Sequence, residues 1–398
     1  MNQANQYQIC DADNHYYEPL DACTRYLPKE FKARGVQFIT TGGRTTCLMG
    51  EKVSHFIPNP TFAPVAVPGC ADDYYRGLTP MHKTIGEVME LEPECRASFR
   101  EREARLAVMD EEGIDKTFLF PTFGYGLEEG LASDPEAAMA TITAFNRWVD
   151  DDWGYNYKGR IYAAPILCLA DPDAAIVELE RVLAGGAAVV TMRPAPAVCV
   201  GGRRSIGDPV YDGIWSRLSE AQVPVAFHIS DSGYQRYMAD WGDHSEFRPI
   251  ARGDMTMGKL IYQERPIFDT IAAMTVHGVF KRNPNLRIAS IENGALWLPL
   301  LIKKLTKAYY QKTIDTFGEP PLDTLRRSLW VSPYAEDDFP ELIELLGVEQ
   351  ILMGSDWPHA EGLAHPREYV QLLEGLSAKD KSLIMRDNFL AFAPRTSA

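Results

Sequence analysis

Short runs of apolar residues recur along the chain, separated by longer segments with apolar residues at every third or fourth position. Each run has the length of one strand and the continuous apolar character of a strand buried on both faces. Eight runs of this kind are expected to be strands, at residues 7–15, 114–121, 160–167, 187–192, 223–229, 286–292, 328–333 and 351–356.

The segments between the strands have the spacing of helices with one buried face. Helices are expected at residues 94–113, 135–153, 171–183, 209–221, 267–282, 295–316, 339–346, 367–376 and 378–389. Short buried strands that alternate with helices predict an α/β protein with a parallel sheet. Eight such units match the (β/α)8 TIM barrel. A doubly wound open sheet is the alternative, but no G-x-G-x-x-G motif follows a strand.

A barrel of this type needs about 250 residues, and the chain has 398. Most of the surplus follows the first strand, where residues 20–93 are rich in glycine and proline. We expect residues 1–398 to form one barrel domain, with residues 20–93 inserted as a cap or lid. Tyr74, Tyr75 and His55 in this insertion are expected to close over the site or to reach a neighbouring subunit. Smaller insertions follow strands 5 and 6.

Composition narrows the class of partner. The chain is 45% hydrophobic and 24% charged, as in a soluble globular protein, and its formal charge is −15. An acidic chain is a poor match for nucleic acid or an anionic membrane surface, and no apolar run reaches the roughly 20 residues of a membrane span. The seven cysteines form no C-x-x-C pair, and the first residues do not resemble a signal peptide. We therefore expect a cytoplasmic protein with reduced thiols and a small-molecule substrate.

Four of the predicted strands end in ionisable residues, and the carboxyl ends of all strands meet at one mouth of a barrel. These residues are Asp13 and His15 on strand 1, His228 on strand 5, Glu292 on strand 6, and Asp356 with His359 at the end of strand 8. Histidine nitrogens and carboxylates are the ligands of zinc and similar divalent ions. Each residue alone has an ordinary structural explanation, but their joint placement predicts a metal site.

Several motifs carry a resemblance to a known family. They are Asp13-x-His15-x-x-Glu18-Pro19, Phe227-His228, Gly278-Val279-Phe280-x-Arg282-x-Pro284-x-Leu286-Arg287, Ile291-Glu292-x-Gly294-x-x-Trp297 and Gly354-Ser355-Asp356-x-Pro358-His359. The chain resembles the amidohydrolase superfamily, in particular the amidohydrolase-related branch that contains aminocarboxymuconate-semialdehyde decarboxylase and the resorcylate-type decarboxylases. The resemblance covers nearly the whole chain. It implies a homodimeric barrel enzyme with one divalent ion, zinc before manganese, and it implies these ligands: Asp13, His15, His228 and Asp356.

Two positions depart from the family pattern. Asp13 stands where better-known members often have a histidine or glutamate, and Glu292 stands where the decarboxylases usually have a histidine. Glu292 retains acid–base capacity, but its presence leaves the reaction open. No lysine ends strand 4, where Thr191, Met192 and Arg193 stand. The binuclear form of the superfamily, with its carbamylated lysine, is therefore not expected.

Three hypotheses of function follow. The first is non-oxidative decarboxylation of an aromatic or unsaturated carboxylic acid, in which Asp356 delivers the proton and Arg193 pairs with a substrate anion. The second is hydrolysis of an amide, ester or lactone by metal-bound water, with Asp356 or Glu292 as the base. In that reaction His359 or His277 would stabilise the oxyanion or protonate the leaving group. The third is a barrel that binds a small molecule without catalysis. The expected catalytic residues are Asp356, Glu292 and His359, and the expected substrate contacts are Glu18, Tyr17, Arg193, His277 and Trp357.

Overall fold

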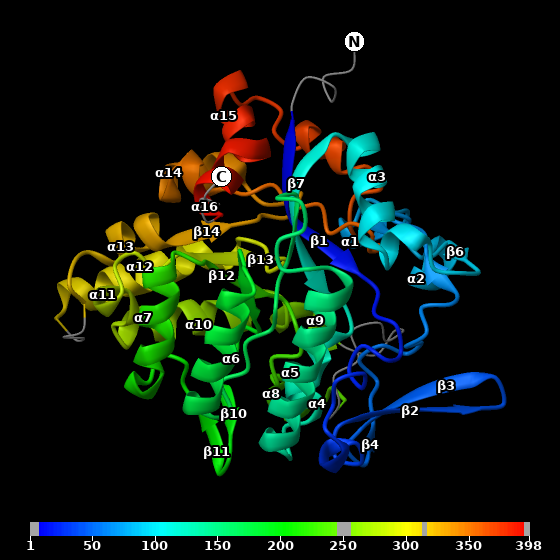
Figure 1. Cartoon of the computed structure of the whole chain (residues 1–398). Coiled ribbons are helices and arrows are strands. Elements are labelled where there is room, and N and C mark those ends of the chain that lie inside the picture. Colours follow the sequence, from blue (N-terminus) through cyan, green and yellow to red (C-terminus); the bar gives the residue numbers. More distant parts are fainter. Residues whose placement is uncertain (1–7, 245–255, 313–316, 394–398) are drawn as a thin grey trace.

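Seven parallel strands and one irregular segment surround the centre of the computed structural model, which describes residues 8–244, 256–312 and 317–393 (Figure 1). The strands are β1 (Ile9–Tyr16), β7 (Ile114–Pro121), β8 (Ile161–Ala163), β9 (Val190–Met192), β12 (Val225–His228), β13 (Ile288–Ile291) and β14 (Leu329–Val331). β1, β7 and β8 pair in this order, and β9, β12, β13 and β14 pair in a second sheet. The first seven predicted strands therefore lie where the apolar runs placed them.

Two irregular stretches join these sheets into a closed barrel. One connects β8 to β9 through residues 165–167, and the other connects β14 to β1 through residues 351–357. Four backbone N–H groups make these connections, each at 2.9 Å: Leu167 to Thr191, Thr191 to Pro165, Leu352 to Val331, and Ala12 to Met353. The predicted eighth strand has the expected neighbours but no regular ladder. The predicted (β/α)8 barrel is confirmed, and the open sheet is excluded because the ring is closed.

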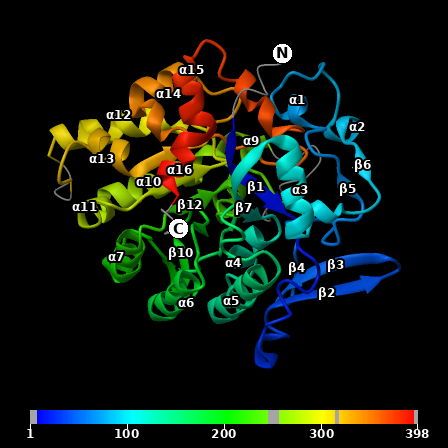
Figure 2. The same ribbon diagram turned by 45° about the horizontal axis from the view of Figure 1, so that its top comes forward.

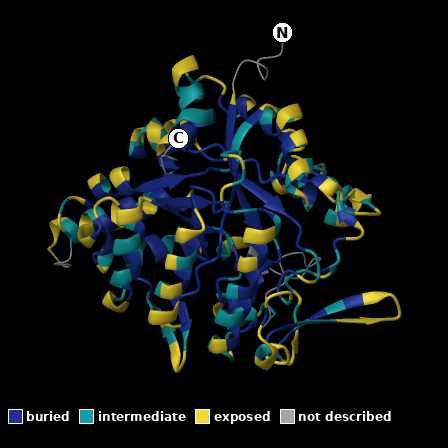
Figure 3. Cartoon of the chain, viewed as in Figure 1, coloured by how far each residue is buried: buried dark blue, intermediate teal, exposed yellow. Residues whose placement is uncertain are grey.

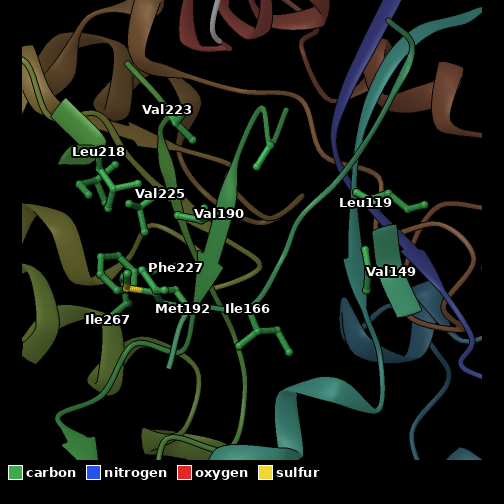
Figure 4. Packing of buried hydrophobic residues seen from close by; sticks show 14 of the residues in the cluster. Leu119, Val149, Ile166, Val190, Met192, Leu218, Val223, Val225, Phe227 and Ile267 are labelled. Carbon is green, nitrogen blue, oxygen red and sulfur yellow. The ribbon is translucent and has the colours of Figure 1, made fainter. Parts of the chain in front are cut away.

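Alternate strand residues face two different cores. One set points into the barrel: Cys10, Ala12, Phe118, Phe120, Tyr162, Ala164, Ala188, Ala226, Ala289, Ile291, Trp330 and Leu352. The other set points outward to the helices, and Figure 4 shows its central part: Leu119, Val190, Val225 and Phe227 of the strands with Val149, Leu218 and Ile267 of the helices. At the amino-terminal end of the barrel, α16 (Asn388–Phe392) supplies a plug. The ring centres of Phe389 and Phe118 lie 4.2 Å apart.

Helices cover the outside of the barrel (Figure 2). They are α3 (Arg102–Glu112), α5 (Pro135–Asp152), α6 (Pro172–Ala184), α7 (Asp212–Ala221), α10 (Glu264–Val276), α11 (Val279–Arg282), α12 (Trp297–Tyr310), α13 (Pro321–Ser328), α14 (Phe339–Leu346) and α15 (Ala378–Ser382). Asp134, Asp171 and Asp338 begin α5, α6 and α14 by accepting backbone N–H groups. Gly113 ends α3 with a φ of 73°, a left-handed conformation that favours glycine.

Several predicted helices differ from the observed ones. The helix predicted at 267–282 is divided by Gly278, whose φ of 74° ends α10 before α11 begins. The helix predicted at 295–316 ends at Tyr310, and residues 313–316 lie outside the described part of the chain. The segment predicted at 367–376 is a 3-10 helix, Pro366–Gln371. α13, directly before β14, was not predicted.

The insertion after β1 consists of two parts. One is an antiparallel sheet of β2 (Val36–Thr41), β3 (Arg44–Met49) and β4 (Lys52–Val53), whose hairpin projects from the barrel at the lower right of Figure 1. The other contains β5 (Val65–Ala66), α1 (Asp72–Tyr75), α2 (Ile85–Val88) and β6 (Leu91–Glu92). Backbone N–H groups of Gly69 and Ala71 donate to the carbonyls of His359 and Ala360, at 3.0 and 2.8 Å. This second part is therefore attached to the loop that follows the eighth barrel segment.

Two further insertions follow the carboxyl ends of barrel strands β9 and β12. After β9 the chain forms a hairpin of β10 (Ala197–Cys199) and β11 (Gly202–Arg204), which was not predicted. After β12 it forms α8 (Gln235–Ala239) and, beyond residues 245–255, α9 (Thr256–Ile261), in the insertion expected after strand 5. The strands are buried, whereas helix surfaces and hairpin tips are exposed (Figure 3). Among the described helices, none is both long enough and apolar enough to cross a membrane.

Candidate metal centre

Four residues from three different segments of the chain meet at the carboxyl ends of β1, β12 and β13. They are Asp13, His15, His228 and Glu292, and their ligand atoms all lie within 4.8 Å of one another. The Nε2 atom of His228 lies 3.3 Å from Asp13 Oδ1 and 3.2 Å from Glu292 Oε2. The site is shielded from solvent, since His15 and His228 are each only 1% exposed.

The two histidines direct unprotonated nitrogens at each other. Nδ1 of His15 lies 3.1 Å from the carbonyl oxygen of Pro121, and Nδ1 of His228 lies 2.8 Å from that of Ile229. A carbonyl only accepts, so each Nδ1 carries the proton and each Nε2 of a neutral ring is a bare acceptor. These two Nε2 atoms are 3.0 Å apart. A cation between them would remove the repulsion, and this donor set suits a divalent metal ion.

Asp356 and His359 adjoin the same cluster. Asp356 Oδ1 lies 3.4 Å from Nε2 of His15 and 2.6 Å from Nδ1 of His359. Nε2 of His359 in turn lies 2.9 Å from the hydroxyl oxygen of Thr122, at the end of β7. Asp356 is thus placed both to bind an ion and to exchange a proton with His359.

Backbone conformation aims two of the carboxylates inward. Glu292 and Asp356 have φ values of 53° and 56°, in the left-handed region that non-glycine residues rarely adopt. Each stands where its barrel segment ends. Strained residues of this kind cluster at functional sites, where the surrounding structure holds them in place.

Asp11, one pleat below Asp13, positions both sides of the site. Its buried carboxylate accepts the side chains of Asn14 and Ser355 at 2.9 and 2.6 Å, and the backbone N–H groups of Asp13 and Ser355 at 3.1 Å each. Burial raises the pKa of Asp11 to about 7. Asp11 therefore ties β1 to the residue before Asp356, and the sequence analysis did not identify it.

Negative charge accumulates in this pocket. Burial raises the pKa of Glu292 well above the usual carboxyl value, and repulsion by Asp356 and Asp13 adds to the effect. Burial also raises the pKa of Asp356, again with a contribution from Asp13. Burial lowers the pKa of His15 well below its usual value, so this ring is neutral. Three carboxyl groups beside two imidazoles fit a divalent cation.

The binuclear form of the superfamily has a carbamylated lysine at the end of the fourth strand. Thr191 of β9 stands there instead, and it bonds to the hydroxyl of Tyr125 at 2.8 Å. The ring of Tyr125 stacks on His228, with centres 4.5 Å apart. Tyr125 is thus a wall of the site that was not among the predicted contacts. In the sequence Tyr125 follows the second predicted strand closely, but many aromatic residues occupy such positions, so its place alone did not single it out.

Two charged residues that were predicted to contact substrate are occupied elsewhere. The Glu18 carboxylate accepts the backbone N–H groups of Thr122, Phe123 and Gly124 at 3.0, 2.9 and 3.0 Å, and so orders the loop after β7. The guanidinium of Arg193 is 5% exposed and forms ion pairs with Glu128 and Glu129 at 3.0 and 2.9 Å. Arg193 therefore joins barrel loops to one another, and the structure does not leave it open to a substrate anion.

The other three predicted contacts also lie apart from the ligand atoms. The Tyr17 hydroxyl donates to the carbonyl of Pro358 at 3.3 Å. Trp357 packs outside the barrel, where the guanidinium of Arg105 lies 4.6 Å from its ring centre. His277 is exposed at the end of α10, with Nδ1 3.0 Å from the Ser205 hydroxyl oxygen. Of the ionisable residues predicted at strand ends, the structure brings together Asp13, His15, His228, Glu292, Asp356 and His359.

A closed (β/α)8 barrel with histidine and carboxylate groups at the carboxyl ends of its strands defines a class of metal-dependent barrel enzymes. A family model described as amidohydrolase matches residues 55–391. The chain therefore belongs to the amidohydrolase family, as the resemblance in sequence implied.

Solved structures agree with this assignment. An amidohydrolase from Mycobacterium avium subsp. paratuberculosis K-10 is 48% identical, with 97% of each chain covered and a TM-score of 0.92. A 2,6-dihydroxybenzoate decarboxylase in complex with 2,6-dihydroxybenzoate is 15% identical, with 97% of this chain and 98% of the other covered and a TM-score of 0.58. A dihydroxybenzoic acid decarboxylase from Polaromonas sp. JS666, with bound manganese and 2-nitroresorcinol, is 17% identical, with 81% and 92% covered and a TM-score of 0.55. The two decarboxylases show likeness of fold alone. A search of the curated proteins found no match.

Proposed function

We propose that this protein is a non-oxidative decarboxylase of an aromatic or unsaturated carboxylic acid. The observation that carries the proposal is the Asp356–His359 pair, joined at 2.6 Å beside the ligand cluster. Loss of CO2 leaves an electron pair on carbon, and that carbon must take up a proton. Asp356 and His359 can carry this proton, because they lie beside the proposed metal ligands. Two solved structures of similar fold are decarboxylases of dihydroxybenzoates, which supports the same chemistry here.

Asp13, His15, His228 and Asp356 would hold one divalent ion, and Glu292 adjoins it. Zinc is the first choice and manganese the alternative, which the manganese in one similar structure supports. When bound, the ion would act as a Lewis acid toward the carboxylate and a neighbouring oxygen of the substrate.

The side chains around the cluster then carry the proton. Asp356 delivers it to the carbon as the bond to CO2 breaks, and His359 returns a proton to Asp356 through Nδ1. The Thr122 hydroxyl fixes the orientation of the His359 ring through its hydrogen bond with Nε2. Phe120, Tyr125 and the buried strands exclude water from the far side of the pocket.

Glu292 favours a second candidate function, hydrolysis of an amide, ester or lactone. Its Oε2 lies 3.2 Å from Nε2 of His228, close enough to accept a proton from water at the site. In this reaction Glu292 or Asp356 is the base, and His359 protonates the leaving group. His277 has no part in it, because it lies at the end of α10. The proposal also includes a cytoplasmic location and a homodimer, and light scattering of the purified protein tests the homodimer.

A substrate panel with one matched pair of variants tests the reaction. Metal-loaded protein is incubated with hydroxybenzoates and with aryl esters and lactones, and CO2 release and ester cleavage are measured. We expect CO2 release and, when the reaction is run in D2O, a deuterium atom at the carbon that lost CO2. His359→Asn should lower kcat by about 100-fold or more at unchanged metal content. His365→Asn is the control, because His365 is exposed and bonds to Glu112. Ester or lactone cleavage without CO2 release would establish the second function instead.

A further inference from the structure

Glu361 lies beside the metal ligand Asp356 because the intervening loop folds back on itself. The backbone N–H of Leu363 donates to the carbonyl of Ser355 at 2.9 Å. A Cβ atom placed on Gly362 would come within 2.6 Å of the carbonyl oxygen of Asp356, so only glycine fits at this contact. The residue before Gly362 is therefore held at the outer rim of the site.

The insertion brings Tyr75 to the same rim. Gly69 and Ala71 bond to residues 359 and 360 of the folded loop, and α1 begins at the next residue and ends at Tyr75. Burial raises the pKa of Tyr75, and the nearby charges of Glu361, Glu292 and Asp356 contribute to the rise. Tyr75 is nevertheless 47% exposed, so one side of its ring faces open space.

Tyr75 and Glu361 differ from the other polar groups around the cluster because they are unpaired. In the part of the chain that the structure describes, neither the Tyr75 hydroxyl nor the Glu361 carboxylate has a hydrogen-bond or ion-pair partner. By contrast, the hydroxyls of Tyr17, Tyr125 and Tyr334 are bonded to Pro358, Thr191 and the carbonyl of Glu292. Two polar groups at the rim are thus free to contact a molecule that binds at the ion.

We propose that Tyr75 and Glu361 form a subsite for the end of the substrate remote from the ion, and that this subsite selects a hydroxyl or amino group over a second carboxylate. The proposal rests on the proposed function, because it takes an acid held by the ion as the substrate. An ionised Glu361 only accepts hydrogen bonds, so it binds O–H and N–H donors and repels anions. The carboxyl groups of Asp13, Glu292 and Asp356 already surround the ion, so a second substrate carboxylate at the rim adds negative charge to an acidic site. The Tyr75 hydroxyl adds a second, neutral partner for the same group.

Equilibrium binding to the manganese-loaded protein tests this subsite by calorimetry. The probes are 2-hydroxybenzoate, its 4- and 5-amino derivatives, and its 4- and 5-carboxy derivatives. At one of the two ring positions, we expect the amino derivative to bind about fivefold more tightly than 2-hydroxybenzoate, and the carboxy derivative about tenfold more weakly. Glu361→Gln should bring both derivatives to within about twofold of the parent acid, and Tyr75→Phe should reduce the advantage of the amino group alone.

Two variants serve as matched controls. Tyr74→Phe changes the neighbouring residue of α1, and Glu368→Gln removes an exposed charge of the following 3-10 helix. Both variants should bind the probes in the same order of affinity as the wild-type protein. An unchanged order in Glu361→Gln, tight binding of a carboxy derivative to the wild-type protein, or failure of every acid to bind would overturn the subsite. Failure of the proposed decarboxylation looks different, because the acids would then bind in the expected order without release of CO2.

Discussion

Nε2 of His15 and Nε2 of His228 face each other at 3.0 Å, and this contact is the strongest sign of a metal ion in the molecule. Each Nδ1–H donates to a backbone carbonyl, so in the neutral form neither ring has a proton on Nε2. Carboxylates of Asp13, Glu292 and Asp356 surround the same point. Neutral acceptors and anions that converge in a buried pocket are unfavourable unless a cation binds among them.

His228→Ala tests this contact. The variant loses one nitrogen ligand, so we expect its metal content to fall from about one ion per chain to below about 0.2. The measurement is elemental analysis of protein purified after growth in metal-replete medium. His277→Ala is the matched control, since His277 lies outside the site and should leave the content unchanged. Equal metal content in His228→Ala and the wild type would remove His228 from the ligand set.

The sequence predicted which candidate ligands lie together, but it did not predict how the charged residues around them are paired. Asp13, His228 and Asp356 were found because each follows an apolar run, and strand ends share one mouth of the barrel. The direction of a side chain at a strand end depends on segments far away in the chain. Arg193 was expected at a substrate anion, but Glu128 and Glu129 neutralise it from a different loop. No local pattern around Arg193 indicates those partners.

The loop after β7 shows how one buried carboxylate orders a barrel element. Glu18 reaches from the end of β1 to three successive N–H groups, at residues 122–124. The same loop supplies Thr122 to His359 and Tyr125 to His228. Glu18 therefore acts on the site indirectly, by fixing the backbone of residues that touch it.

A dependence of stability on pH follows from Glu18. Burial raises the pKa of Glu18 to about 7 in the folded protein, whereas the unfolded value is about 4.3. The folded state binds more protons between these values, so the free energy of unfolding falls as the pH rises through this window. The contribution between pH 5 and pH 7 is about 2 kcal/mol. Urea unfolding of the metal-free protein measures it.

Glu18→Gln cannot titrate, so the variant should lose that part of the pH dependence, while Glu368→Gln on the surface should retain it. If the free energy of unfolding of Glu18→Gln changed with pH as steeply as that of the wild type, the folded state would not raise the pKa of Glu18.

Elements with a strong periodic pattern were predicted well, and those set by tertiary contacts were not. α5, α6 and α14 follow the helical spacing of their apolar residues, with an aspartate at each start. The eighth barrel segment was placed correctly, but it pairs with its neighbours only through isolated bridges at Ile351 and Trp357. The β10–β11 hairpin was missed, since its three-residue strands are too short to show alternation.

The barrel as a whole holds the candidate metal centre at one end and is filled by aromatic rings at the other. Phe389 and Phe392 of α16 pack against Phe118 and Trp330 inside the barrel, with ring centres 4.2 and 5.1 Å apart. The last described helix thus completes a core that the eight strands alone leave unfilled. The aromatic plug and the candidate metal centre therefore lie at opposite ends of the same strands.

Phe389→Ala tests this separation. Removal of a fully buried ring should lower the free energy of unfolding by about 3 to 5 kcal/mol, while metal content stays near that of the wild type. Chemical unfolding and elemental analysis of the same preparation measure both quantities. Leu300→Ala is the control, because Leu300 is 52% exposed on α12, and it should change stability by less than about 0.5 kcal/mol. Loss of metal in Phe389→Ala at a temperature where it is folded would contradict the separation.

The metal content of the wild-type protein decides whether the cluster at the barrel mouth is a metal centre at all. The protein is purified after growth with zinc and manganese supplied, dialysed against metal-free buffer, and analysed for elements per chain. Asp13, His15, His228 and Asp356 predict about one divalent ion per chain that survives dialysis. A content below about 0.2 ion per chain would contradict this and favour a barrel that binds a small molecule without metal-dependent catalysis.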